Sequence, residues 1–235
     1  EARELSIALA ALETAVDEKT RIIHIVNPSN PTGAILSESD RDALLQIADR
    51  SGAWIVADEV YSGTERHTDV PTQSFWGTSE RVIAVNSMSK AYGLPGLRLG
   101  WLGAPEAVIT RCWRRHEYAS ISASMMSMQL ADYALRSETR TRLTERARRL
   151  IRRGFETLTE ALDVCPGVFS VVPPQASAMS FVGFHLPVTS DALARRLLEE
   201  EDVLVIPGSK FGVEGHFRLS SALPQDHLAE GLGRL

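Results

Sequence analysis

Reactive side chains follow three short apolar runs of the sequence, at residues 21–26, 53–57 and 81–86. The side chains after these runs, in chain order, are Asn30, Asp58, Tyr61, Ser87, Ser89 and Lys90. In open α/β sheets, ligands bind beyond the carboxyl ends of the strands. If the runs are neighbouring strands, we expect an amide, a carboxylate, a phenol, an amine and two hydroxyls to converge on one edge of a sheet.

The amine of Lys90 is the candidate nucleophile of this set, because an amine can form a Schiff base with a carbonyl. Enzymes that use pyridoxal 5'-phosphate pair such a lysine with a charged partner at the pyridinium nitrogen. Asp58 suits that position, since a nearby carboxylate favours the protonated ring nitrogen. Tyr61 and Asn30 can both donate a hydrogen bond to the phenolate oxygen of the ring.

A phosphate-binding group is also available close to Lys90 in the sequence. Ser87 and Ser89 offer hydroxyls, and Arg98 offers a planar guanidinium that can bind a phosphate with two hydrogen bonds. Each of these residues alone would have a simpler explanation, such as a turn, a helix cap or a surface charge. Their joint occurrence favours the chemical interpretation.

The elements that must position these residues alternate between strands and helices. Strands are predicted at 21–26, 53–57, 81–86 and 97–103, and helices at 4–18 and after Ser37, where Ser37 and Asp40 resemble a capping box. Apolar strands separated by helices are typical of a parallel sheet covered on both faces. A long helical region follows at 105–163.

The pattern changes after Pro166, where short strands are predicted at 168–172, 179–184, 203–206 and 216–220, with helices at 190–201 and 225–235. We therefore predict an α/β protein with a mostly parallel sheet sandwiched by helices and a smaller C-terminal α+β domain. The division is placed at residues 1–140 and 141–235. Five arginines between residues 146 and 153 are interpreted as the solvated face of an amphipathic helix rather than as a binding patch.

Four motifs, in this order, resemble those of pyridoxal-phosphate-dependent aminotransferases of fold type I, class I/II, the aspartate aminotransferase-like group. The motifs are Asn27-Pro-Ser-Asn-Pro-Thr-Gly33, Asp58-Glu-Val-Tyr61, Ser87-Met-Ser-Lys90 with its continuation to Arg98, and Phe217-Arg-Leu-Ser220. The resemblance spans residues 20–235. It implies pyridoxal 5'-phosphate as the cofactor, with Lys90 forming the Schiff base and moving a proton between the substrate α-carbon and the cofactor.

The resemblance also implies a role for each remaining candidate. The catalytic residues would be Lys90, Asp58 and Tyr61, and the cofactor-binding residues would be Asn30, Asp58, Tyr61, Ser87, Ser89, Lys90 and Arg98. Arg218 would bind the substrate α-carboxylate as a fork, together with Asn30, and so orient the hydrogen on the α-carbon. No metal site is expected, because the six histidines show no metal-binding spacing.

The implied reaction is the transfer of an amino group between an amino acid and a 2-oxo acid in a cytoplasmic homodimer. Two alternatives stay open: an oxidase or cyclase acting on arginine or a derivative, similar to capreomycidine synthase, and a non-catalytic aminotransferase-like sensor domain. The net charge of −5 offers no field for nucleic acid, and no apolar run approaches the roughly 20 residues of a membrane span. We therefore expect neither partner.

We expect the chain to be part of a longer polypeptide, because it opens at Glu1 and its first methionine is Met88. Members of the family carry an N-terminal half of the large domain, with a Gly-containing phosphate loop and an aromatic ring that stacks on the cofactor. Neither feature is found in residues 1–26. The polar segment 116–128 is expected to approach the substrate side chain.

Overall fold

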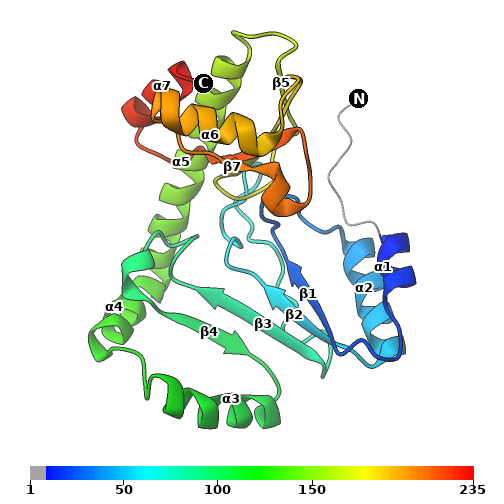
Figure 1. Ribbon diagram of the computed structural model, residues 1–235. Helices are drawn as coiled ribbons and strands as arrows, with labels where there is room; N and C mark the ends of the chain where they lie inside the picture. Colours follow the sequence, from blue (N-terminus) through cyan, green and yellow to red (C-terminus); the bar gives the residue numbers. More distant parts are fainter. Residues whose placement is uncertain (1–8) are drawn as a thin grey trace.

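A computed structural model of the chain describes residues 9–235. Figure 1 shows two sheets, with the long helix α5 (Ser137–Leu162) running from the first sheet to the second. The predicted helix at 4–18 is present as α1 (Leu9–Ala15), and its earlier part lies outside the described residues. Residue 140, where the sequence analysis places the division between the two domains, lies within helix α5. The division between the domains stays a prediction.

The first sheet has the order β1 (Ile22–Val26), β2 (Trp54–Asp58), β3 (Val82–Ser87) and β4 (Gly100–Gly103). The first three strands are parallel, as predicted, but β4 runs antiparallel to β3. The predicted strand at 97–103 is shorter because a 3₁₀ turn, η1 (Pro95–Leu97), ends at Arg98 in the left-handed conformation. The connection at residues 88–99 contains only this 3₁₀ turn and no α-helix of the kind that usually carries a parallel crossover, and β4 returns along β3.

Helix α2 (Glu38–Ser51) packs against one face of this sheet and carries the predicted capping box between Ser37 and Asp40. Its Leu44 is fully buried among strand residues such as Ile55, and Leu9 and Leu12 of α1 pack against the same core. Within the described part of the chain, the cover is incomplete, since Trp101 on β4 remains 41% exposed. The expected cover on both faces is therefore only partly present.

The predicted helical region at 105–163 consists of three helices, α3 (Glu106–Ala119), α4 (Met125–Leu135) and α5. The first break contains Ile121 in the left-handed conformation, and the second is the extended residue Arg136. None of the residues of α3 is buried. Figure 1 shows this helix at the bottom of the molecule, away from the second sheet.

The second sheet is antiparallel, with the order β5 (Phe169–Val171), β6 (Met179–Phe184), β8 (His216–Ser220) and β7 (Ile206–Pro207). Helices α6 (Ser190–Glu201) and α7 (Gln225–Gly233) and the short η2 (Gly208–Phe211) accompany it. Phe155 and Leu158 of α5 share its core with Phe217. These elements match the predicted α+β pattern, except that the strand expected at 203–206 is found at β7.

Across the described residues, no helix is both long and apolar enough to cross a membrane.

Candidate active site

The carboxyl ends of β1, β2 and β3 lie side by side. Val26 pairs with Asp58, and Asp58 pairs with Val85. Beyond the strands, the Asn27 amide donates to the Asp58 carbonyl at 2.9 Å, and the Glu59 amide donates to the Val85 carbonyl at 2.9 Å. These bonds extend the sheet register into the three reactive segments and bring them to one edge, as the sequence predicts.

Lys90 and Tyr61 meet at this edge. The Lys90 Nζ lies 5.9 Å from the centre of the Tyr61 ring, within the range of a cation–π contact. The Lys90 side chain is exposed, whereas Tyr61 is only 5% exposed. The segment that carries the lysine is anchored by Met88, which is fully buried against Ala131 and Ala134 of α4. The amine is therefore accessible although its backbone is packed.

The electrostatic surroundings keep Tyr61 protonated. Burial raises the pKa of the phenol above its ordinary value of 10.0; Arg218 acts in the opposite direction, and the charge of Asp58 raises it further. The phenol is thus a hydrogen-bond donor at neutral pH. Asp58 is itself fixed, because its Oδ1 accepts a hydrogen bond from the Val60 amide at 3.1 Å.

Arg218 is the residue of the second sheet that lies at the site. It lies on β8, and its Nη1 donates a hydrogen bond of 2.9 Å to the Oδ1 of Asn30. Its guanidinium carbon is 5.1 Å from the centre of the Phe211 ring. The loop that carries Asn30 also makes a backbone hydrogen bond to the second half of the chain, since the Ala176 amide donates to the Gly33 carbonyl at 2.9 Å.

Ser87, Ser89 and Arg98 lie along the turn between β3 and β4. Ser87 pairs with Gly100 across the two strands, and its Oγ accepts from the Ser89 amide at 3.3 Å. Arg98, two residues before Gly100, is exposed and donates from Nη1 to the Pro95 carbonyl at 3.0 Å. In the described residues, no side-chain hydrogen bond joins Arg98 to either serine.

The donor set fits pyridoxal 5'-phosphate. Within residues 9–235, the Lys90 amine, the Tyr61 hydroxyl and the Asp58 Oδ2 make no hydrogen bond, so each is available to a ligand. An amine suits an aldehyde, a carboxylate suits a pyridinium nitrogen, and hydroxyls with a guanidinium suit a phosphate.

Two buried acids close to the site were not singled out by sequence reasoning. Glu59 is 6% exposed, and its carboxylate accepts a hydrogen bond from the Phe75 amide at 2.7 Å. Burial raises the pKa of its carboxyl. Glu65 is 1% exposed and pairs with Arg148 of α5 at 3.4 Å.

Arg148 corrects the interpretation of the arginine-rich stretch as a solvated face, because it is 5% exposed. The position of Arg148 relative to the apolar residues of the helix indicates its burial, although the sequence analysis did not use this pattern. Residues three and seven positions apart share one face of a helix, and Ile151 and Phe155 stand at those distances after Arg148. The same apolar stripe that predicts the helix therefore places Arg148 on its buried side.

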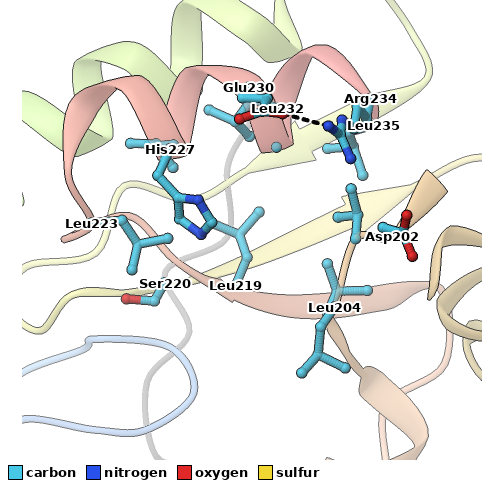
Figure 2. A pocket seen from close by; sticks show the side chains of 14 residues that line it. Asp202, Leu204, Leu219, Ser220, Leu223, His227, Glu230, Leu232, Arg234 and Leu235 are labelled. Atoms are coloured by element: carbon cyan, nitrogen blue, oxygen red, sulfur yellow. Dashed lines mark hydrogen bonds and ion pairs between the residues drawn. The ribbon is translucent and has the colours of Figure 1, made fainter.

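A cavity of about 340 Å³ lies elsewhere, between α7, the strand β8 and the segment 202–205 that precedes β7 (Figure 2). It is lined by Leu219, His227 and Leu228, among others, and holds none of the predicted site residues. Leu219 follows Arg218 on β8, and successive side chains of a strand point to opposite faces. The cavity is thus separate from the predicted site residues. No group of three metal-ligating side chains occurs in the part of the chain described.

Comparison with known proteins gives a consistent result. The family described as aminotransferase class I and II matches residues 2–235. An aspartate aminotransferase of Streptomyces avermitilis is 30% identical over 97% of this chain and 59% of its own length. Capreomycidine synthase of Streptomyces vinaceus is 31% identical over 95% of this chain and 57% of its own length.

Among solved structures, a PLP-dependent aminotransferase from Streptococcus suis superimposes with a TM-score of 0.88 at 32% identity. The match covers 97% of this chain and 60% of that one. The chain spans less than two thirds of the length of these relatives.

Proposed function

The chain belongs to the class I and II aminotransferases, and on that premise we propose that its protein transfers an amino group between an amino acid and a 2-oxo acid with pyridoxal 5'-phosphate. The observation that best supports this proposal is that Lys90 lies against Tyr61 at one edge of the first sheet, while Arg218 is hydrogen-bonded to Asn30 in the loop after β1. Residues far apart in the sequence supply an amine, a phenol and a carboxylate-binding fork to one place.

Pyridoxal 5'-phosphate, when bound, supplies an aldehyde for the lysine and a ring that withdraws electrons from the substrate α-carbon. Lys90 Nζ holds the cofactor and then carries the proton that leaves the α-carbon. Its exposed side chain gives it the freedom for both tasks. Asp58 keeps a proton on the ring nitrogen, because opposite charges stabilise each other.

The other residues bind and orient. The protonated phenol of Tyr61 and the amide of Asn30 donate to the ring oxygen, and Ser87, Ser89 and Arg98 bind the phosphate. Arg218 binds the substrate α-carboxylate through both arms of its guanidinium. The hydrogen bond from Arg218 to Asn30 fixes the fork before substrate arrives, which reduces the entropy lost on binding.

We propose a homodimer in the cytoplasm as the working form. Large apolar side chains on α3 and α4 are exposed, and exposed apolar surface of this kind is typical of interaction sites: Trp113, Tyr118, Met125, Met126 and Tyr133. Cys112 and Cys165 are free thiols, which accords with a reducing compartment. A mass that stays monomeric at every concentration in sedimentation experiments would contradict the dimer.

The sequence allows a sharp test, because it contains three lysines, Lys19, Lys90 and Lys210. The protein is mixed with pyridoxal 5'-phosphate, reduced with borohydride, digested and analysed by mass spectrometry. We expect the cofactor on Lys90 and its loss in Lys90→Ala, together with the loss of multiple turnover. Lys19→Ala and Lys210→Ala are matched controls, since both side chains are exposed and lie outside the site. Label on either of these two instead of Lys90 would refute the assignment.

The similarity to capreomycidine synthase supports a second candidate, oxidation or cyclisation of arginine or a derivative. The two reactions differ in product. Transamination gives a 2-oxo acid and leaves the nitrogen on the cofactor, whereas oxidation consumes oxygen. An amino-acid panel with an oxygen electrode separates them, and cofactor binding without any turnover would favour the sensor domain.

A further inference from the structure

We propose that the buried ion pair between Glu65 and Arg148 is a positioning device that holds Tyr61 against Lys90. The proposal rests on the proposed function, because Tyr61 matters there as a cofactor contact. Neither Glu65 nor Arg148 touches the reactive groups. Each acts through the turn that follows Tyr61.

The Glu65 carboxylate organises that turn from inside the protein. Its Oε1 accepts hydrogen bonds from the Gly63 amide at 3.0 Å, from the Thr72 amide at 2.7 Å and from the Thr72 hydroxyl at 2.8 Å. Its Oε2 pairs with Arg148 Nη2 at 3.4 Å. The two ends of the loop, at Gly63 and Thr72, are thus tied to one carboxylate, and that carboxylate is tied to α5.

The same turn holds Tyr61 on one side and the lysine segment on the other. The Tyr61 carbonyl accepts from the Thr64 amide at 3.1 Å and from the Thr64 hydroxyl at 2.5 Å. Gly63, with φ of +100°, faces Ala91, since a Cβ built there would lie 3.4 Å from the Ala91 Cβ. Ala91 directly follows Lys90, so movement of this turn changes the spacing of phenol and amine.

Helix α5 is the fixed partner of the turn. A Cβ at Gly63 would also lie 3.4 Å from Thr144 of α5. Arg152, one helical turn after Arg148, donates to the Arg66 carbonyl at 2.7 Å. The Arg66 guanidinium in turn lies 3.8 Å from the centre of the Phe155 ring. Because Phe155 also belongs to the core of the second sheet, the ion pair links the Tyr61 turn to the half of the chain that carries Arg218.

The carboxylate at position 65 cannot be replaced without consequence. Glu65→Gln keeps one acceptor oxygen but turns a donor amide toward Arg148, whose buried charge is then left with only the exposed Asp69 carboxylate, 3.8 Å away. Removing one member of a buried ion pair is strongly unfavourable for that reason. The turn is expected to separate from α5, which admits water to the Tyr61 phenol.

The experiment measures the ionisation of Tyr61 in the cofactor-free protein by tyrosinate absorbance, with circular dichroism confirming the fold at each pH. The same titration in a Tyr61→Phe background isolates this residue from the other three tyrosines. We expect Glu65→Gln and Arg148→Met each to lower the pKa of Tyr61 by about 0.5–1 pH unit, toward that of a free phenol. Because both act through one pair, the double variant should show no larger shift than the singles.

Asp69→Asn is the matched control. Asp69 lies in the same loop and is 3.8 Å from Arg148 and 2.9 Å from Arg152, but its side chain is 76% exposed. We expect it to leave the pKa of Tyr61 unchanged. In the holoenzyme, Glu65→Gln should lower kcat about tenfold with little change in KM, since the substrate fork is intact.

A lower melting temperature with an unmoved Tyr61 titration would overturn the proposal, because it is the outcome of a purely structural role. If Glu65→Gln does not fold, Glu65→Asp is measured instead, and a smaller shift in the same direction supports the proposal. Failure of the proposed function is recognised separately, because the wild-type protein would then carry no cofactor on Lys90. The titration of Tyr61 in the cofactor-free protein would still show whether the ion pair positions Tyr61.

Discussion

The guanidinium of Arg218 donates a 2.9 Å hydrogen bond to the side-chain oxygen of Asn30, 188 positions earlier in the chain. One residue belongs to the second sheet and the other to the loop after the first strand of the first sheet. In the proposed function, Arg218 binds the substrate carboxylate, and Asn30 contacts the cofactor ring as well as supporting this fork. Their hydrogen bond therefore couples substrate recognition to cofactor orientation.

Replacing Arg218 by lysine tests this coupling. Lysine keeps the charge but loses the planar fork, so it cannot hold a carboxylate and Asn30 in one fixed geometry. We expect KM for the amino acid to rise about tenfold or more, the effect of a lost charge-assisted hydrogen bond. Steady-state kinetics measure it. Arg234→Lys, at an ion pair with Glu230 on α7, is the control. If Arg218→Lys and Arg234→Lys have the same KM for the amino acid, Arg218 does not bind the substrate.

The local parts of the fold and site can be predicted from the sequence. The run at 81–86 and the residues after it are contiguous, so strand and reactive groups are found together. The capping box at Ser37 is similarly contained in four residues. Motifs in sequence order then predict which segments meet at the edge of the sheet.

Contacts between distant segments are where sequence reasoning failed. The helical spacing of Arg148 places it on the buried face of α5, but its partner Glu65 lies 83 positions away, and no local pattern identifies that partner. The burial of Glu59 is equally hard to predict, because the amide that it binds belongs to Phe75, in a loop without regular structure. The chain reverses direction before β4 through a turn in which Arg98 is left-handed, and arginine does not ordinarily mark a left-handed turn.

Gly33 joins the loop that carries Asn30 to the second half of the chain. Its φ is +69°, and a Cβ there would overlap the Ala176 carbonyl oxygen and the Pro174 side chain. We expect Gly33→Ala to lower the free energy of unfolding by about 3–5 kcal/mol, the range for a severe clash with strain. Urea unfolding measures it.

Gly77 provides the matched comparison for this prediction. Its φ is +80°, but nothing lies within 4 Å of an added Cβ. Gly77→Ala should therefore cost only the left-handed strain, about 1–2 kcal/mol. If the two variants lose the same stability, the contact between Gly33 and Ala176 does not hold the loop.

Glu59 should make the stability of the protein fall as the pH rises. Burial is the main cause that raises the pKa of its carboxyl above 4.5; the Phe75 amide, Ser74 and Arg41 lower it, and Asp58 raises it. Above that pH, the unfolded chain loses the proton of Glu59 while the folded chain keeps it. The unfolded state then binds fewer protons, and unfolding becomes easier with increasing pH until the folded pKa is passed.

Glu59→Gln cannot ionise, and its amide oxygen can still accept the hydrogen bond from Phe75. We therefore expect the free energy of unfolding of Glu59→Gln, minus that of the wild type, to increase as the pH is raised from about 4 to 7. Urea titrations at each pH measure this difference, in which the other carboxyl groups cancel. Glu199→Gln, at an exposed position of α6, is measured in the same way as the control variant. A constant difference for Glu59→Gln would mean that water reaches the Glu59 carboxylate in the folded protein.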